Sequence, residues 1–139
     1  MRKILSAVLA LCFLTLVLSA CAAPYAGDAR MGEYICLGPD GETVVYRVTL
    51  EENGKGVMIH YPAFGAETRE EIFFTFDNDV LRLHGTEVVG GVIGRNEFYG
   101  TVALASDHSA NVGSQATVYA FELYSSQTHI SLGNFVQVR

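Results

Sequence analysis

The sequence predicts an all-β domain, an antiparallel up-and-down meander that closes into a small barrel, with a β-sandwich as the alternative. From Gly32 onward, apolar and polar residues alternate over short runs, as they do in half-buried strands. Turn-forming pairs such as Asn53-Gly54 separate these runs, and no stretch after Met31 keeps helical spacing over three turns. Sequential hairpins with short turns favour the meander, because closure into a barrel also removes exposed strand edges.

The first twenty residues have the composition of an export signal. Arg2 and Lys3 precede an almost wholly apolar run of about 15 residues, which is shorter than the roughly 20 that a membrane-spanning helix needs. Ser19 and Ala20 then supply the small residues of a cleavage site, followed by Cys21. A transmembrane anchor is the alternative, and the length of the run favours a signal peptide over residues 1–20.

The stretch Leu18-Ser19-Ala20-Cys21 resembles the lipobox of bacterial lipoproteins. The resemblance implies cleavage between Ala20 and Cys21 and attachment of a diacylglyceryl lipid to the Cys21 thiol, with acyl chains such as palmitate. Two acyl chains anchor a protein stably, whereas one holds only marginally. We therefore expect a lipid anchor on the extracytoplasmic face of a bacterial membrane, either the cell membrane or the outer membrane. A plain secretory site with a chance cysteine is the alternative.

The charge and cysteine content fit an exported domain. Without Arg2 and Lys3, seven basic side chains remain against fifteen acidic ones, a net charge of −8 with histidine neutral. Such a balance argues against nucleic acid as a partner, because phosphates attract clustered Lys and Arg. Of the three cysteines, Cys12 is lost with the signal and Cys21 is acylated, so Cys36 has no partner for an intramolecular disulfide. We expect Cys36 to be a half-buried, inert thiol.

The chain after Cys21 divides into a tether and a single β-barrel domain over residues 32–139. Residues 22–31 are small residues with Pro and Gly and lack periodicity, so residues 21–31 predict a lipidated cysteine and a linker that reaches at most about 35 Å. The expected strands cover residues 32–37, 43–50, 55–61, 69–76, 80–85, 87–93, 97–104, 116–124 and 129–138.

Four turn signals predict the register of the hairpins. A two-residue loop at Asn53-Gly54, of the type that needs positive φ at both positions, would pair Leu50 with Val57 and Val48 with Ile59. The other three loops and their expected pairs are Asp40-Gly41 (Leu37 with Val44, Ile35 with Tyr46), Asn78-Asp79 (Phe76 with Leu81, Phe74 with Leu83) and Arg95-Asn96 (Ile93 with Phe98, Val89 with Val102). In each case the apolar faces meet, so turn chemistry and apolar pattern agree.

The first strands carry a second resemblance, to small bacterial lipoproteins with lipocalin-like domains. The matching residues are the opening Gly32-Glu33-Tyr34 and the hairpin that carries "ENGKG" at residues 52–56. Such proteins often carry a tryptophan in a middle strand, where this chain has Phe73 and Phe74. The resemblance implies a lipocalin-like barrel, without implying a ligand.

No constellation in the sequence predicts catalysis or a cofactor. The four histidines lack the spacing of a zinc site, and His60 and His84 are expected on the solvent face of their strands. The members of a Ser-His-Asp triad come from separate elements, so the adjacent residues 106–109 do not predict a hydrolase. Glycines 90, 91 and 94 precede no helix, which excludes a dinucleotide fingerprint. Glu70 and Glu71 are expected to be solvated, because no calcium-binding loop is recognisable.

The remaining candidate site is the long polar loop over residues 105–116. Long loops on a rigid scaffold concentrate binding residues. Its candidate contact residues are Ser106, Asp107, His108, Asn111 and Gln115. Since large apolar residues dominate the inward rows, we expect a filled barrel that works as a binding or protein-contact module of the cell envelope. A lipocalin-like carrier of an apolar ligand and a small extracytoplasmic hydrolase are the alternatives.

Overall fold

The computed structural model describes residues 23–89, 92–106 and 117–139, with the side chains of residues 86–96 and 106 left aside. These described residues form strands and no helix. The strands are β1 (Gly32–Leu37), β2 (Val44–Leu50), β3 (Lys55–His60), β4 (Thr68–Asp77), β5 (Val80–Val89), β6 (Val92–Thr101), β7 (Ala103–Ser106), β8 (Thr117–Ser125) and β9 (Ser131–Val138).

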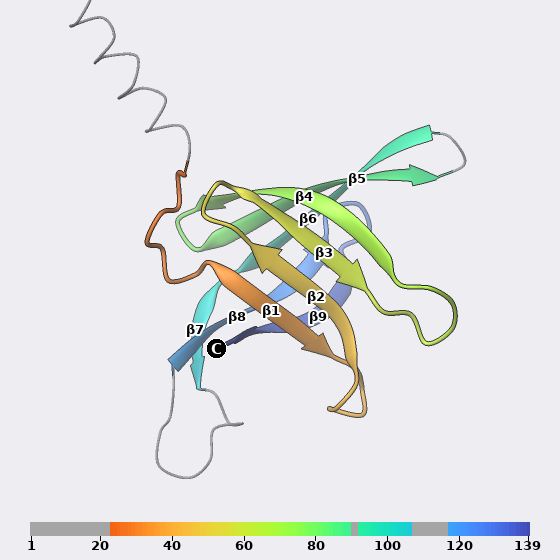
Figure 1. Ribbon diagram of the computed structural model, residues 1–139, viewed down its shortest axis with the longest axis horizontal. Coiled ribbons are helices and arrows are strands. Elements are labelled where there is room, and N and C mark those ends of the chain that lie inside the picture. The colour runs from red at the N-terminus through yellow and green to blue at the C-terminus, as the bar shows by residue number, and fades with distance from the viewer. Residues whose placement is uncertain (1–22, 90–91, 107–116) are drawn as a thin grey trace, which may run out of the picture.

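All strand pairs are antiparallel, and the sheet closes on itself (Figure 1). Neighbouring strands follow the order β6-β5-β4-β3-β2-β1-β9-β8, and an additional pairing of β6 with β8 completes the ring. The result is an eight-strand barrel with β7 as an extra strand on β8. The prediction of an antiparallel meander closed into a small lipocalin-like barrel is confirmed, and the sandwich alternative is not observed.

The barrel has two ends, which we name for the segment that enters it. The strap end is where β1 begins, and it carries the turns at residues 51–54 and 78–79 and the C-terminus of β9. The far end is where β1 finishes, and it carries the connections 38–43, 61–67 and 126–130. Figure 1 shows the strap end on the left and the far end on the right.

Large apolar side chains fill the barrel from the strap end to its middle. The inward positions alternate with outward ones along each strand, as the pleat requires. Nine of these side chains are less than 2 % exposed and belong to one core cluster: Tyr34, Val48, Leu50, Ile72, Leu81, Leu83, Phe121, Leu123 and Phe135. Phe121 and Phe135 stack across β8 and β9 with ring centroids 5.3 Å apart. Burial of this apolar surface is the main stabilising contribution to a barrel that has no disulfide among its described residues.

The hairpin register is confirmed in one case and corrected by one residue in another. Phe76 pairs with Leu81 and Phe74 with Leu83, as expected, and Asn78 in the turn has a φ of 53°. At the Asn53-Gly54 turn, however, Leu50 pairs with Gly56 rather than with Val57.

The reason for that correction is a loop of three residues instead of two. The amide of Glu51 donates to the carbonyl of Lys55, the amide of Gly54 donates to the carbonyl of Glu51, and only Gly54 has a positive φ, of 83°. This arrangement is a type I turn with a bulge at glycine. Gly56 and Met58 therefore face the interior, and Val57 and Ile59 face outward. Apolar residues on both faces of β3 made the alternation ambiguous.

The first hairpin follows the expected register only next to its turn. Leu37 pairs with Val44 as predicted, but a bulge between Cys36 and Leu37 shifts the rest, so that Ile35 pairs with Arg47 and Cys36 with Tyr46. The bulge turns Tyr34 and Cys36 into the core. Here, too, local turn chemistry set one pair while tertiary packing set the others.

The hairpin predicted at Arg95-Asn96 is wrong. These residues lie within β6, where they pair with Thr86 and Gly85 of β5, and the ribbon runs on to the pair Val89–Val92. The predicted strands 80–85 and 87–93 thus give way to one long β5 and the start of β6, which extend together past the other strands in Figure 1. The dipeptide Gly90-Gly91, itself a recognised hairpin signal, lies between these two strands in the sequence.

The barrel closes where β6 meets β8, and the closure depends on Gly100. β6 and β7 follow β8 in one continuous register, from Phe98 opposite Ser125 to Ala103 opposite Ala120. A Cβ on residue 100 would lie only 2.3 Å from the backbone carbonyl oxygen of Glu122. Only glycine allows the two backbones to approach this closely.

Candidate functional site

The segment expected to be a linker packs onto the barrel over residues 23–31, which we call the strap (orange in Figure 1). The ring of Tyr25 stacks on Phe74, with centroids 5.1 Å apart, and meets Phe76 edge-on at 5.6 Å. The amide of Phe76 donates a hydrogen bond of 3.1 Å to the Tyr25 hydroxyl. Residues 23–31 of the expected linker are therefore packed against the barrel.

Buried polar groups beneath the strap hold its backbone. The hydroxyl of Tyr34 donates to the carbonyl of Arg30 at 2.6 Å. The amide nitrogen of Gln137, a residue that is only 7 % exposed, donates to the carbonyls of Ala29 at 2.9 Å and Met31 at 3.0 Å. These bonds satisfy side chains that would otherwise be costly to bury. Burial also raises the pKa of Tyr34, which keeps its hydroxyl protonated as a donor.

Arg30 ties the end of the strap to the turn between β4 and β5. Its guanidinium lies 3.9 Å from the centroid of the Phe76 ring, donates to the carbonyl of Asn78 at 2.8 Å, and pairs with Asp28 at 2.6 Å. The hydrogen bond from Arg30 lowers the pKa of Asp28. The strap thus closes the strap end of the barrel with both apolar and charged contacts.

The site residues proposed from the sequence lie largely outside the described residues. Ala20 and Cys21 precede the first described residue, and Asp107, His108, Asn111 and Gln115 fall between β7 and β8. Ser106 is the last residue of β7. Since β7 finishes and β8 begins at the strap end, the connection between them starts and returns there.

The far end of the barrel carries inward polar groups that the sequence reasoning placed on the surface. His60 shares the inward face of β3 with Gly56 and Met58, and its ring stacks on Tyr46 with centroids 4.5 Å apart. Tyr46 in turn lies 6.0 Å from Phe135, and burial raises its pKa. The expected solvent-facing position of His60 is therefore wrong, as a consequence of the register error at Asn53-Gly54. His84 lies on the outward face of β5, a strand that is not adjacent to β3, and it is exposed as expected.

Glu70 is a second inward polar residue near the far end. It shares a face of β4 with Ile72 and Phe74, and a Cβ at position 85 would lie only 2.2 Å from its carboxylate oxygen. Gly85 thus makes room for this carboxylate, whereas Glu71 is exposed. The expectation of two solvated carboxylates holds for Glu71 alone. Strict alternation along β4 was the signal that could have separated them.

Cys36 is more deeply buried than expected. Only 3 % of the residue is exposed, and its sulfur lies 2.5 Å from where a Cβ on Gly133 would be. Burial raises the pKa of the thiol, which disfavours the reactive thiolate. Cys36 is thus a core residue that packs against the backbone of β9.

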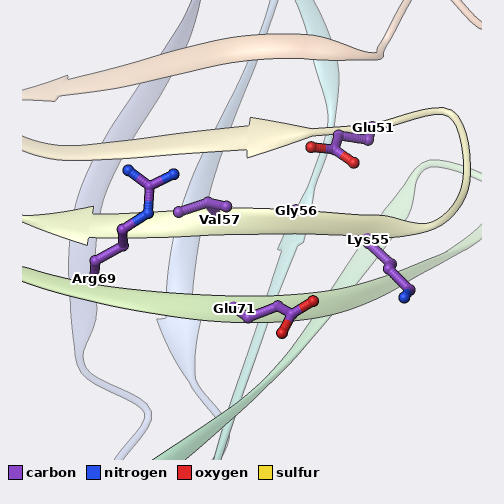
Figure 2. Close-up of a pocket in the computed structure, with 6 residues that line it drawn as sticks. All are labelled: Glu51, Lys55, Gly56, Val57, Arg69 and Glu71. Carbon is purple, nitrogen blue, oxygen red and sulfur yellow. The ribbon is translucent and has the colours of Figure 1, made fainter.

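The outer wall of β2, β3 and β4 holds a shallow groove of about 380 Å³ (Figure 2). Figure 2 shows Glu51 and Glu71 on either side of β3, with Arg69 directed toward Val57 and Lys55 at the opposite edge. Charges of both signs around an apolar floor suit contact with a polar surface better than enclosure of an apolar molecule.

A row of exposed side chains runs from this groove around the barrel. The strand pairing places Lys55 beside Phe73, Phe73 beside His84, and His84 beside Glu97. Phe73 is 51 % exposed, the Lys55 ammonium lies 5.8 Å from the centroid of its ring, and the Nδ1 atom of His84 lies 3.6 Å from the Glu97 carboxylate.

Two tyrosines continue the same wall over the closure of the barrel. The rings of Tyr99 and Tyr124 stack at 5.7 Å, and the Tyr99 hydroxyl lies 3.4 Å from the Nδ1 atom of His129. His129 has a φ of 56°, which is unusual for a residue with a side chain. We call the residues of this wall the outer-wall patch: Lys55, Phe73, His84, Glu97, Tyr99, Tyr124 and His129. Phe73 is exposed and the two tyrosines are half-buried, and aromatic residues at a surface among charges are typical of contact surfaces.

No family model, curated protein or solved structure matches this chain. Within residues 23–89, 92–106 and 117–139, no helix has the length and hydropathy of a membrane span. The same part of the chain holds no group of three or more His, Cys, Asp or Glu side chains placed to share a metal ion. The geometry of the barrel therefore carries the functional argument.

Proposed function

We propose that this chain is a lipid-anchored barrel of the bacterial cell envelope, held at the extracytoplasmic face of a membrane through Cys21, and that it acts as a protein-contact module. The filled interior is the observation that supports contact over transport. A carrier of an apolar ligand needs space inside the barrel, whereas nine fully buried apolar side chains occupy the interior from the strap end to the middle.

The outer-wall patch is the surface that this function would use. Phe73 places half of an aromatic ring in solvent, and Lys55, His84 and Glu97 surround it with groups that can pair with a partner's charges. Aromatic anchors inside a polar rim are the usual arrangement of energetically important contacts between proteins. A partner that presents an apolar side chain between charged groups would fit this patch.

The lipid anchor is tested by metabolic labelling with radioactive palmitate. The Cys21→Ala variant should lose the label and either accumulate as uncleaved precursor or leave the membrane fraction. Cys12→Ala provides a matched control, because it removes a cysteine from the apolar run and should leave labelling intact. Unchanged labelling of Cys21→Ala would contradict the proposed anchor.

The contact surface is tested by photo-crosslinking in cells. A photoreactive amino acid replaces Phe73 in one variant and Val138 in another, since both are apolar outer positions with similar exposure, 51 % and 44 %. Position 73 should give a defined adduct of higher mass that position 138 does not give. Equal adducts from both positions, or none from position 73, would contradict a contact at the outer-wall patch.

The carrier alternative has its own assay. The purified domain should show no saturable binding of an apolar fluorophore such as anilinonaphthalene sulfonate. Saturable binding that a fatty acid displaces would overturn the proposal of a filled contact module in favour of a carrier.

A further inference from the structure

We infer that the strap fixes the orientation of the barrel on the membrane, with the strap end against the lipid headgroups and the far end pointing away. This inference rests on the proposed lipid anchor at Cys21. The inference adds which surface of the barrel meets the membrane. That surface is determined by the folded strap and not by the lipobox.

The chain between the proposed anchor and the strap is short. Ala23 and Ala26 form a turn, and the amide of Tyr25 donates at 2.9 Å to the carbonyl of Glu52 in the turn between β2 and β3. Only Ala22 lies between Cys21 and Ala23, so these two residues are at most about 7 Å apart. A free linker over residues 22–31 would instead allow about 35 Å and any orientation.

Contacts at several places on the barrel hold the strap in a fixed position. Its contacts come from four different places on the barrel: Phe74 and Phe76 on β4, the 51–54 turn, Tyr34 on β1, and Gln137 on β9. Contacts spread around the rim prevent the strap from acting as a hinge about one point. The barrel must then follow the position of residue 23.

The strap end is acidic at its turns. Four exposed carboxylates lie at or beside its turns, on Glu51, Glu52, Asp77 and Asp79. Charged groups cannot enter the hydrocarbon without a large cost, so this end would rest on the hydrated headgroups. The strap end therefore fits a membrane of zwitterionic lipids, while the two acyl chains supply the affinity for that membrane.

The orientation also decides which described parts of the barrel lie near the membrane and which lie away from it. β7 finishes and β8 begins at the strap end, so in this orientation these two strand ends lie on the membrane side of the barrel. The far end carries Phe64, which is 93 % exposed, and faces away from the lipid. A soluble partner would reach the far end and the outer-wall patch.

Short-range fluorescence quenching in vesicles tests the orientation. The acylated protein is reconstituted into phosphatidylcholine vesicles that contain a lipid with a nitroxide on its headgroup. One variant carries a thiol-reactive fluorophore at Asn53→Cys on the strap end, and another carries it at Phe64→Cys on the far end. Cys36 is buried and Cys21 is acylated, so the unmodified sequence reports background labelling. The label at position 53 should be quenched several-fold more than the label at position 64.

Flotation of the vesicles separates the two ideas. If the protein does not float with vesicles, the lipid anchor fails, and the orientation fails with it. If the protein floats but both labels are quenched equally, the anchor stands and the orientation is overturned. In the Tyr25→Ala variant, which loosens the strap, flotation should persist while the difference between the two labels shrinks. An unchanged difference in a variant whose circular dichroism is native would show that the strap does not set the orientation.

Discussion

Replacing Tyr25 by alanine should destabilise the barrel although the residue lies outside every strand. The ring contacts Phe74 and Phe76 at centroid distances of 5.1 and 5.6 Å, and its hydroxyl accepts a hydrogen bond from the Phe76 amide. Each aromatic pair contributes about 0.5–1.5 kcal/mol beyond burial, and a hydrogen bond contributes about 1 kcal/mol. The expected loss is therefore about 2–4 kcal/mol in the free energy of unfolding.

Thermal and urea denaturation followed by circular dichroism would measure this loss. For a domain of this size, about 1 kcal/mol corresponds to about 4 °C in Tm, so the variant should melt about 8–16 °C below the parent protein. Tyr25→Phe is the matched control. It keeps both ring contacts and removes only the hydroxyl, so it should cost about 0.5–1.5 kcal/mol.

The outcome that refutes this reasoning is a Tyr25→Ala variant within about 0.5 kcal/mol of the parent, the range of an ordinary surface substitution. Residues 23–31 would then be the free linker that their composition suggests, and the orientation inferred for the barrel would lose its support. A loss equal to that of Tyr25→Phe would instead assign the whole effect to the hydrogen bond.

Three further predictions follow from single positions. Gly100→Ala places a Cβ 2.3 Å from a backbone carbonyl oxygen of β8 and should lower the free energy of unfolding by about 1–3 kcal/mol or more in chemical denaturation. Gly41→Ala is the control, because a Cβ there would have no neighbour within 4 Å. Its φ of 72° alone should cost about 1 kcal/mol. Burial raises the pKa of Tyr34 above its ordinary 10.0, so this hydroxyl ionises in the unfolded state before it ionises in the folded state. The free energy of unfolding should therefore fall as the pH rises above 10. In urea melts, Tyr34→Phe should show a smaller decline over the same pH range. Hydrogen bonds from the hydroxyl and the amide of Thr43 lower the pKa of Asp40 to about 2. Thr43→Ala removes the hydroxyl alone and should raise this pKa toward 3.8 in a carboxyl NMR titration, and an unchanged value would contradict the bond from the hydroxyl.

Local information in the sequence was sufficient where one signal dominated. The Asn78-Asp79 turn joins runs with one clearly apolar face, and its register is as predicted. At Asn53-Gly54 the same type of signal led to an error of one residue, because β3 has apolar residues on both faces and the loop takes one residue more. The position of His60 followed that error. A side chain's face depends on register, and a shift of one residue reverses it.

The docking of the strap and the space that admits Glu70 depended on contacts that no local pattern contains. Tyr25 meets its ring partners about fifty positions later in the sequence, and Gln137 reaches the strap across almost the whole domain. Glu70 is accommodated because Gly85 on the neighbouring strand lacks a side chain. Composition alone described residues 22–31 as a linker, since small residues lack periodicity whether or not they pack.

Alternation and turn chemistry in the chain were enough to establish the class of the fold, its antiparallel hairpins and its apolar interior, because these depend on neighbours a few residues apart. Closure into a barrel was predicted, but the strand pairs that close the ring, the bulge at Cys36 and the docking of the strap were decided only by the tertiary structure. They require β1 to meet β9, β6 to meet β8, and Tyr25 to meet β4. Such contacts join distant residues, and their free energy comes from burial and close packing of surfaces that exist only once the barrel has formed.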